Sequence, residues 1–194
     1  MTYYSLAVED DLSDGVVRRL LRDVRPGAVV HASRVTSGFG QLKKNILAFN
    51  NAAKAIPQLV LTDLDHEECA PALVTSWMGA AERHPRLWFR VAVKEIEAWL
   101  LAHRQAVAQF LGIQINLVPH NPEELNDPKA SLIQLARYCT NRGRRRAIVP
   151  KGVAVQGPDY NRELLEFVMS DWNPEVARQT APSLHRAMIR LATL

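Results

Sequence analysis

The sequence predicts an α/β fold: a Rossmann-like parallel sheet of about four strands with helices on both faces, followed by a helical C-terminal extension. Three observations predict it. Short apolar segments alternate with amphipathic ones along the first part of the chain, which is typical of a parallel sheet. Hydrophobic residues make up 47% of the 194 residues, enough for a substantial core. Beyond Pro119, strand-like segments give way to helix-start signals.

The first two strand–helix units are predicted at residues 3–8 and 16–24, and at residues 28–35 and 41–56. The start of the chain is aromatic and apolar, as expected of a strand, and apolar residues then recur at helical spacing. Pro26 and Gly27 stop the first helix, and Pro57 ends the second.

The next two units are predicted at residues 59–62 and 73–82, and at residues 87–93 and 98–111. The third strand is a short apolar run, and the fourth has an apolar residue at every second position. Pro71 favours a helix start, and Gly112 ends the last helix. Residues 113–118 are a candidate additional strand at the edge of the sheet.

We expect an α/β domain over residues 1–118 and a helical extension over residues 119–194, packed on the same core. In the extension, helices are predicted at residues 130–139, 162–169 and 173–192, and a basic loop at residues 141–146. A signal peptide and an apolar run of membrane-spanning length are not recognised, so we expect a cytoplasmic protein that is not associated with a membrane. The net charge of +4 permits a nucleic-acid partner.

Acidic residues follow three of the predicted strands: Glu9 the first, Asp63 and Asp65 the third, and Glu95 and Glu97 the fourth. Because the carboxyl ends of parallel strands share one edge of a sheet, these side chains are expected to converge. Carboxylates held together stay ionised when a cation lies between them, and oxygen ligands favour Mg²⁺ or Mn²⁺. The pattern therefore predicts a divalent-metal site, of a kind suited to phosphodiester hydrolysis. In the alternative, the two aspartates only turn the chain or cap a helix.

The ordered motifs resemble the TOPRIM domains of topoisomerases, primases and nucleases of the overcoming-lysogenization-defect type. A glutamate after a first strand and Asp-x-Asp after a later strand carry this resemblance. More narrowly, a bacterial TOPRIM-like family of unknown function, often encoded beside ATPases in phage-defence operons, has similar segments. These segments are V-E-D-D-L-S-D, L-T-D-L-D, V-K-E-I-E-A-W-L-L-A, D-P-K-A-S-L and S-L-H-R-A-M.

The resemblance implies a magnesium-dependent nuclease acting on DNA or RNA, the effector of a defence system with an ATPase partner, in a type of protein that often forms homodimers. It assigns Glu9 to metal binding or acid–base work and Asp63 and Asp65 to metal binding. Glu95 and Glu97 correspond to further carboxylates of the nuclease branch. Topoisomerase activity is not expected, because the chain is too short for strand passage.

Basic residues complete the predicted site. Lys129 and Lys151 are candidate catalytic residues that would neutralise a phosphate or activate water near the metal. A run of four arginines is a candidate contact for nucleic-acid phosphates, formed by Arg142, Arg144, Arg145 and Arg146. In the alternative, all six are solvated surface residues.

Two other functions remain open from the sequence. One is a non-catalytic subunit that binds nucleic acid or nucleotides and keeps the acidic edge for metal-assisted binding. The other is a phosphotransfer domain in which Asp63 or Asp65 is a covalent nucleophile.

Overall fold

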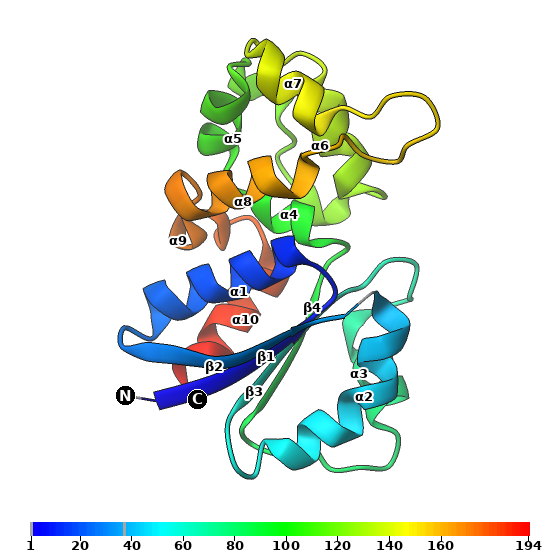
Figure 1. Cartoon of the computed structure of the whole chain (residues 1–194), viewed down its shortest axis with the longest axis vertical. Coiled ribbons are helices and arrows are strands. Elements are labelled where there is room, and N and C mark those ends of the chain that lie inside the picture. Colours follow the sequence, from blue (N-terminus) through cyan, green and yellow to red (C-terminus); the bar gives the residue numbers. More distant parts are fainter. Residues whose placement is uncertain (1, 37) are drawn as a thin grey trace. The chain divides into compact units, whose positions relative to one another are not determined.

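The computed structural model describes residues 2–36 and 38–194 (Figure 1). Their contacts divide the chain into two compact units. Met1–Val93 forms the first together with Arg186–Leu194, and Lys94–His185 forms the second. The division at residues 118 and 119 stays a prediction about domains. The contact boundary instead follows Val93 and returns the end of the chain to the first unit.

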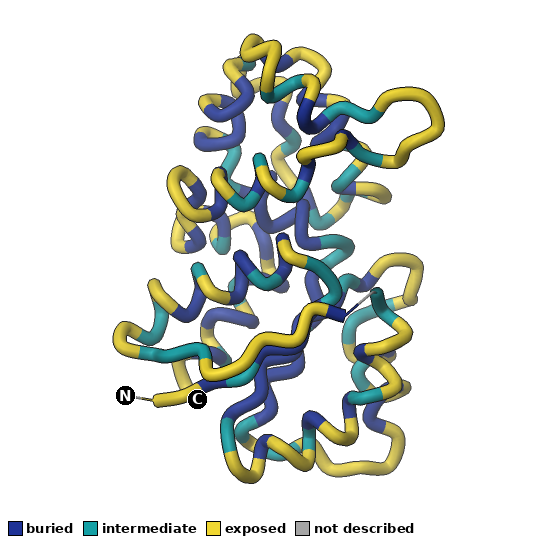
Figure 2. Tube along the Cα trace, viewed as in Figure 1, coloured by how far each residue is buried: buried dark blue, intermediate teal, exposed yellow. Residues whose placement is uncertain are grey.

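The first unit is built on a parallel sheet of four strands in the order β2-β1-β3-β4. β1 (Thr2–Val8) lies between β2 (Ala28–Val35) and β3 (Gln58–Asp63), and β4 (Leu87–Ala92) pairs with the far side of β3. Figure 2 shows β2 as the more exposed edge and β3 as a buried strand. The predicted α/β class and parallel sheet are confirmed.

Helices cover both faces of this sheet (Figure 1). α1 (Asp11–Val24) and the C-terminal part of α10 (Pro182–Ala192) lie on one face. α2 (Phe39–Ala52) and α3 (Ala70–Met78) lie on the other, where they enclose an apolar core with the sheet. This core contains, among others, Leu42, Ile46, Val60, Trp77 and Phe89.

Local sequence explains how α1 begins and which face it buries. Asp10 is its N-cap, and its carboxylate accepts a hydrogen bond from the Ser13 backbone N–H at 2.8 Å. Leu12, Val16 and Leu20 recur at helical spacing and are fully buried. Because the cap lies directly after Glu9, the start of α1 also fixes the chain that leaves β1.

The second unit is helical and comprises α4 (Ile96–Leu101), α5 (Arg104–Leu111), α6 (Pro128–Ala136), α7 (Arg142–Ile148), α8 (Tyr160–Ser170) and α9 (Pro174–Ala177), with 3₁₀ turns at Ile115–Leu117 and Pro122–Glu124. Two buried tryptophans join its segments. The Trp172 indole N–H donates to the Trp99 carbonyl at 3.0 Å, and the Trp99 indole N–H donates to the Ser183 hydroxyl at 2.7 Å. The predicted helical C-terminal region is confirmed. Within the described chain, every helix is too short or too polar to cross a membrane.

Four local predictions were wrong. The helix predicted over residues 98–111 is interrupted at residues 102–103, and the one predicted over residues 173–192 is interrupted at residues 178–181. Residues 113–118 do not form a strand; they contain the 3₁₀ turn, which Arg104 holds by donating to the carbonyls of Ile115 and Val118 at 3.0 Å. Residues 141–146 are not a loop, because α7 begins at Arg142. Asn141 caps this helix by accepting from the Arg144 backbone N–H at 3.1 Å, a start signal that the sequence interpretation overlooked.

Candidate functional site

The carboxyl ends of β1 and β3 are neighbours at the point where the strand order reverses. From β1 the chain crosses through α1 on one face to β2, whereas from β3 it crosses through α3 on the other face to β4. Connections that leave adjacent parallel strands toward opposite faces open a crevice between them, and open α/β sheets bind ligands there. Glu9 follows β1 directly, and Asp63 is the last residue of β3.

Hydrogen bonds join the Glu9 side chain to the end of β3. Its Oε1 accepts from the Asp63 backbone N–H at 3.1 Å and from the Thr62 hydroxyl. Thr62 is buried, so its hydroxyl is held in place beside the carboxylate. The structure therefore brings together two strand ends whose acidic residues were predicted to converge, and their metal-binding role stays a prediction.

The Glu9 carboxyl group lies in surroundings that disfavour its ionised form. Burial raises the pKa of Glu9 above its ordinary value, and the negative charges of Asp65 and Asp10 raise it further. The hydrogen bonds from Thr62 and Asp63 act in the opposite direction. A carboxylate whose pKa is raised by neighbouring carboxylates is stabilised in its ionised form when a cation lies nearby.

The backbone between the two aspartates takes an unusual conformation. Leu64 is buried and its N–H donates to the Ala92 carbonyl at 2.9 Å, so pairing with β4 extends one residue beyond β3. Asp65 then has a positive φ of 48°, a left-handed conformation that aspartate tolerates better than most side chains. Asp65 is exposed, whereas Asp63 is half-buried.

Glu95 and Glu97 belong to the second unit, at the start of α4. Glu95 Oε2 accepts from the Lys129 backbone N–H at 2.8 Å, which satisfies a free donor in the first turn of α6. Glu97 is buried, and its Oε1 accepts from the Tyr160 hydroxyl at 2.8 Å. Burial raises the pKa of Glu97 to about 7; Lys129 and Tyr160 oppose this rise, and Glu95 adds to it.

Lys129 therefore lies beside both predicted acids of the second unit. Its ammonium is 5.1 Å from the centre of the Tyr160 ring, and its charge stabilises ionised Glu97. Glu95 and Lys129 also line a pocket of about 360 Å³ together with Asp127 and Arg137. Two carboxylates, an ammonium and a guanidinium therefore line this pocket, and their formal charges balance.

The arginine run lies on α7. The Arg144 guanidinium forms an ion pair with Glu163 at 3.2 Å, lies 3.9 Å from the centre of the Phe110 ring and donates to the Phe110 carbonyl. The Arg144 guanidinium is therefore bound to other residues of the second unit. Arg142 and Arg146 are exposed and Arg145 is half-buried. A role of the run in nucleic-acid binding stays a prediction, as does the catalytic role of Lys151, an exposed residue between α7 and α8.

Sequence reasoning missed Thr62 and Tyr160, which hold the two key glutamates. Thr62 carried a usable signal, because it directly precedes Asp63 at the end of a predicted strand. Tyr160 carried none, because it is 63 residues away from Glu97 and only the packing of α8 brings it there.

Among residues 2–36 and 38–194, no three His, Cys, Asp or Glu side chains are grouped closely enough to hold a metal ion as they lie. Comparison of the chain with protein-family models, curated proteins and solved structures gives no match.

Proposed function

We propose that this protein is a TOPRIM-like nuclease that requires Mg²⁺ or Mn²⁺ and cleaves phosphodiester bonds of DNA or RNA. The hydrogen-bonded approach of Glu9 to the end of β3, beside Asp63 and Asp65, supports it best. This edge is where an open parallel sheet binds ligands. The four-stranded parallel sheet is also compatible with a TOPRIM-like fold.

The donor chemistry of this edge fits a hard divalent ion. Glu9, Asp63 and Asp65 offer carboxylate oxygens, the ligands that Mg²⁺ and Mn²⁺ prefer. Burial raises the pKa of Glu9 and the charges of Asp65 and Asp10 add to the rise, so a nearby cation would stabilise its ionised form. Without a cation, carboxylates repel one another, so a set of three is expected to close only around the ion.

The three acids would hold the ion, which when bound would neutralise phosphate charge and activate a water molecule. The Thr62 hydroxyl and the Asp63 N–H orient the Glu9 carboxylate for this role. Contacts to substrate phosphates are proposed for Arg142, Arg145 and Arg146, with Arg144 serving to hold α7 in place.

Further parts of the proposal rest on the sequence resemblance. These are the metal or catalytic roles of Glu95, Glu97, Lys129 and Lys151, the ATPase partner, the defence function and the homodimer.

The deciding experiment replaces both aspartates, Asp63→Asn with Asp65→Asn, and measures two properties. The first is Mn²⁺ binding by calorimetry, and the second is cleavage of labelled DNA and RNA with Mg²⁺ or Mn²⁺. We expect cleavage to fall roughly 100-fold or more, because the ligands that position charge at the phosphate are lost. Metal affinity is expected to fall with it.

The matched control replaces two exposed acids of the same connection, Glu67→Gln with Glu68→Gln. It removes the same formal charge and is expected to leave both properties unchanged. Full cleavage by the aspartate variant would overturn the proposal. Metal-dependent binding of nucleic acid or nucleotides without turnover would favour the non-catalytic subunit instead.

A further inference from the structure

Four arginines lie on β4, on the connection that leads into it and on α10. In the described part of the chain β4 is an outer strand of the sheet, and α10 covers one of its faces. The Trp88 indole N–H donates to the Ala187 carbonyl of α10 at 2.9 Å, which identifies that face. Arg90 lies two residues after Trp88, so its side chain leaves β4 on the same face.

α10 contributes two of the arginines. Arg186 and Arg190 are four residues apart and therefore neighbours on one side of the helix. The Arg190 guanidinium donates to the Pro85 carbonyl and, at 2.9 Å, to the Thr193 hydroxyl. This contact fastens α10 to the connection that leads into β4, and Arg83 lies on the same connection.

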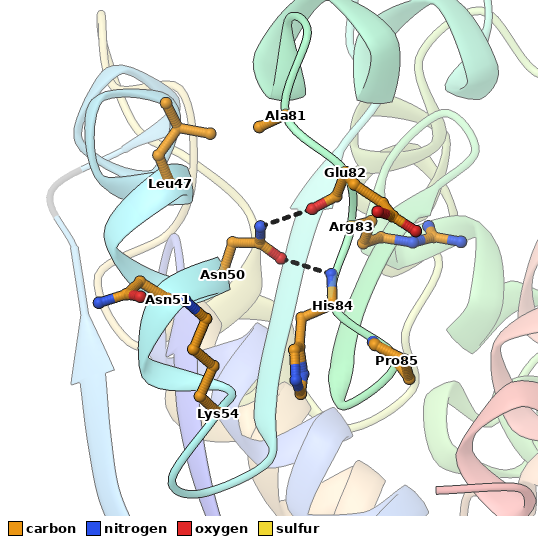
Figure 3. Close-up of a pocket in the computed structure, with 9 residues that line it drawn as sticks. All are labelled: Leu47, Asn50, Asn51, Lys54, Ala81, Glu82, Arg83, His84 and Pro85. Carbon is orange, nitrogen blue, oxygen red and sulfur yellow. Dashed lines mark hydrogen bonds between the residues drawn. The ribbon is translucent and has the colours of Figure 1, made fainter.

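The backbone around Arg83 is held by Asn50 of α2 (Figure 3). The Asn50 amide donates to the Glu82 carbonyl at 2.9 Å, and its oxygen accepts from the His84 backbone N–H at 2.8 Å. Both neighbours of Arg83 are therefore fixed, while Arg83 itself is exposed. Its guanidinium is presented to solvent from a rigid connection.

The positive charge of this cluster is not neutralised. Burial, and to a smaller extent the charges of Arg83, Arg190 and Arg186, together lower the pKa of Arg90 to about 10. The Arg90 Nε–H is buried and, within the described chain, has no hydrogen-bond partner. Among residues 2–36 and 38–194, none of the four forms an ion pair with a carboxylate. An anion would satisfy the free donor and offset the repulsion.

We propose that Arg83, Arg90, Arg186 and Arg190 form a binding site for phosphate groups. Guanidinium groups match the geometry of phosphate oxygens through paired N–H donors, and four of them suit a multiply charged oxyanion better than a single carboxylate. A phosphodiester backbone is the favoured source, because Arg83 and Arg186 are exposed and accessible to a large ligand. Arg83 and Pro85 precede β4, whereas Asp63 pairs with Ala92 at its carboxyl end; Arg90 lies between them, on the face that α10 covers. The site does not depend on the proposed cleavage activity.

The test measures binding of a fluorescein-labelled oligonucleotide by anisotropy at several salt concentrations, in the presence of a chelator so that no metal-dependent cleavage occurs. The test variant is Arg83→Glu with Arg186→Glu; both residues are exposed, and circular dichroism checks the fold. We expect the affinity for the oligonucleotide to fall on the order of tenfold or more. The slope of log K against the logarithm of the salt concentration should become shallower by about two. The matched control, Lys43→Glu with Lys44→Glu, changes two exposed cations on α2, alters the formal charge by the same amount and is expected to leave both unchanged.

A second variant, Arg90→Lys, keeps the charge but removes the buried Nε–H and the planar fork. We expect it to weaken binding without changing the salt slope, because the number of positive charges is unchanged.

Inorganic phosphate provides the second arm, read as the rise in melting temperature of the full chain. One outcome is that phosphate raises the melting temperature of the natural protein but not that of the Arg83→Glu, Arg186→Glu variant, while both bind the oligonucleotide with equal affinity. In that case the site binds free phosphoryl groups. Natural oligonucleotide affinity in that variant, together with natural stabilisation by phosphate, would overturn the proposal.

Discussion

Glu97 differs from the other predicted acids in how completely it is removed from water. Only 4% of its surface is exposed, and it relies on the Tyr160 hydroxyl and the charge of Lys129 for stabilisation. Burial without full compensation keeps a carboxyl group protonated to higher pH than usual. The protonation of Glu97 therefore changes in the neutral range, close to the pocket that Lys129 lines.

This property predicts a pH-dependent stability. The pKa of Glu97 is about 7 in the folded chain against an ordinary 4.5, so the folded state binds this proton more tightly. The resulting stabilisation is fully present below about pH 4.5 and is lost as the pH rises through about 7, a change on the order of 3 kcal/mol. The Glu97→Gln variant keeps an acceptor for Tyr160 but cannot ionise, so its stability should fall less over this range.

The measurement is denaturant unfolding at several pH values in the presence of a chelator. Glu166→Gln serves as the control, because Glu166 is an exposed acid of the same unit. The free energy of unfolding of this variant should depend on pH in the same way as that of the natural protein. An unchanged pH profile in Glu97→Gln would contradict the assignment of this dependence to Glu97.

At the scale of elements, the connection between α7 and α8 depends on close backbone contact. The Gly157 N–H donates to the Ile148 carbonyl at 2.9 Å, and the Asp159 N–H donates to the Ala147 carbonyl at 3.1 Å. A Cβ atom at Gly157 would lie 2.1 Å from the Ala147 carbonyl oxygen. That oxygen belongs to the backbone of α7 and cannot move aside as a flexible side chain would.

Gly157→Ala is therefore expected to lower the free energy of unfolding by roughly 1–3 kcal/mol or more, because the connection must shift away from α7. Gly40→Ala is the matched control. Gly40 lies in α2 with no atom within 4 Å of an added Cβ, so the same change should be neutral or stabilising by up to about 1 kcal/mol. Equal free energies of unfolding for the two variants would show that the close approach of the Ala147 carbonyl does not exclude a side chain at Gly157.

At the scale of the whole molecule, the end of the chain completes the first unit. Leu191 is fully buried, whereas Ile189 on the same helix is 49% exposed. Together with the hydrogen bond from Trp88 to Ala187, this burial shows that α10 is part of the packing of the sheet.

Leu191→Ala should lower the free energy of unfolding by roughly 2–5 kcal/mol, because it leaves a cavity in a packed layer. Ile189→Ala should change it by less than about 0.5 kcal/mol. Hydrogen exchange adds a local reading: amides of β4 should exchange faster in Leu191→Ala. Unaltered exchange in β4 would contradict the role of α10 in covering this strand.

From the sequence alone, only those site residues could be predicted that adjoin a recognisable local pattern. Glu9 and Asp63 were found because each follows a segment with the composition of a strand, and strand ends can be located from periodicity. The helix α7 was missed because its arginines have no apolar periodicity, and only the Asn141 cap marks its start.

The sequence by itself determined the α/β class, the parallel sheet and the acids that follow its strands, because apolar spacing and turn residues act over a few positions. The tertiary structure decided the order β2-β1-β3-β4, which brings Glu9 beside Asp63 across 54 residues. It also decided the pairing of Glu97 with Tyr160 and the arginine cluster shared by β4 and α10. Such contacts depend on which elements pack together, and no local pattern encodes that choice.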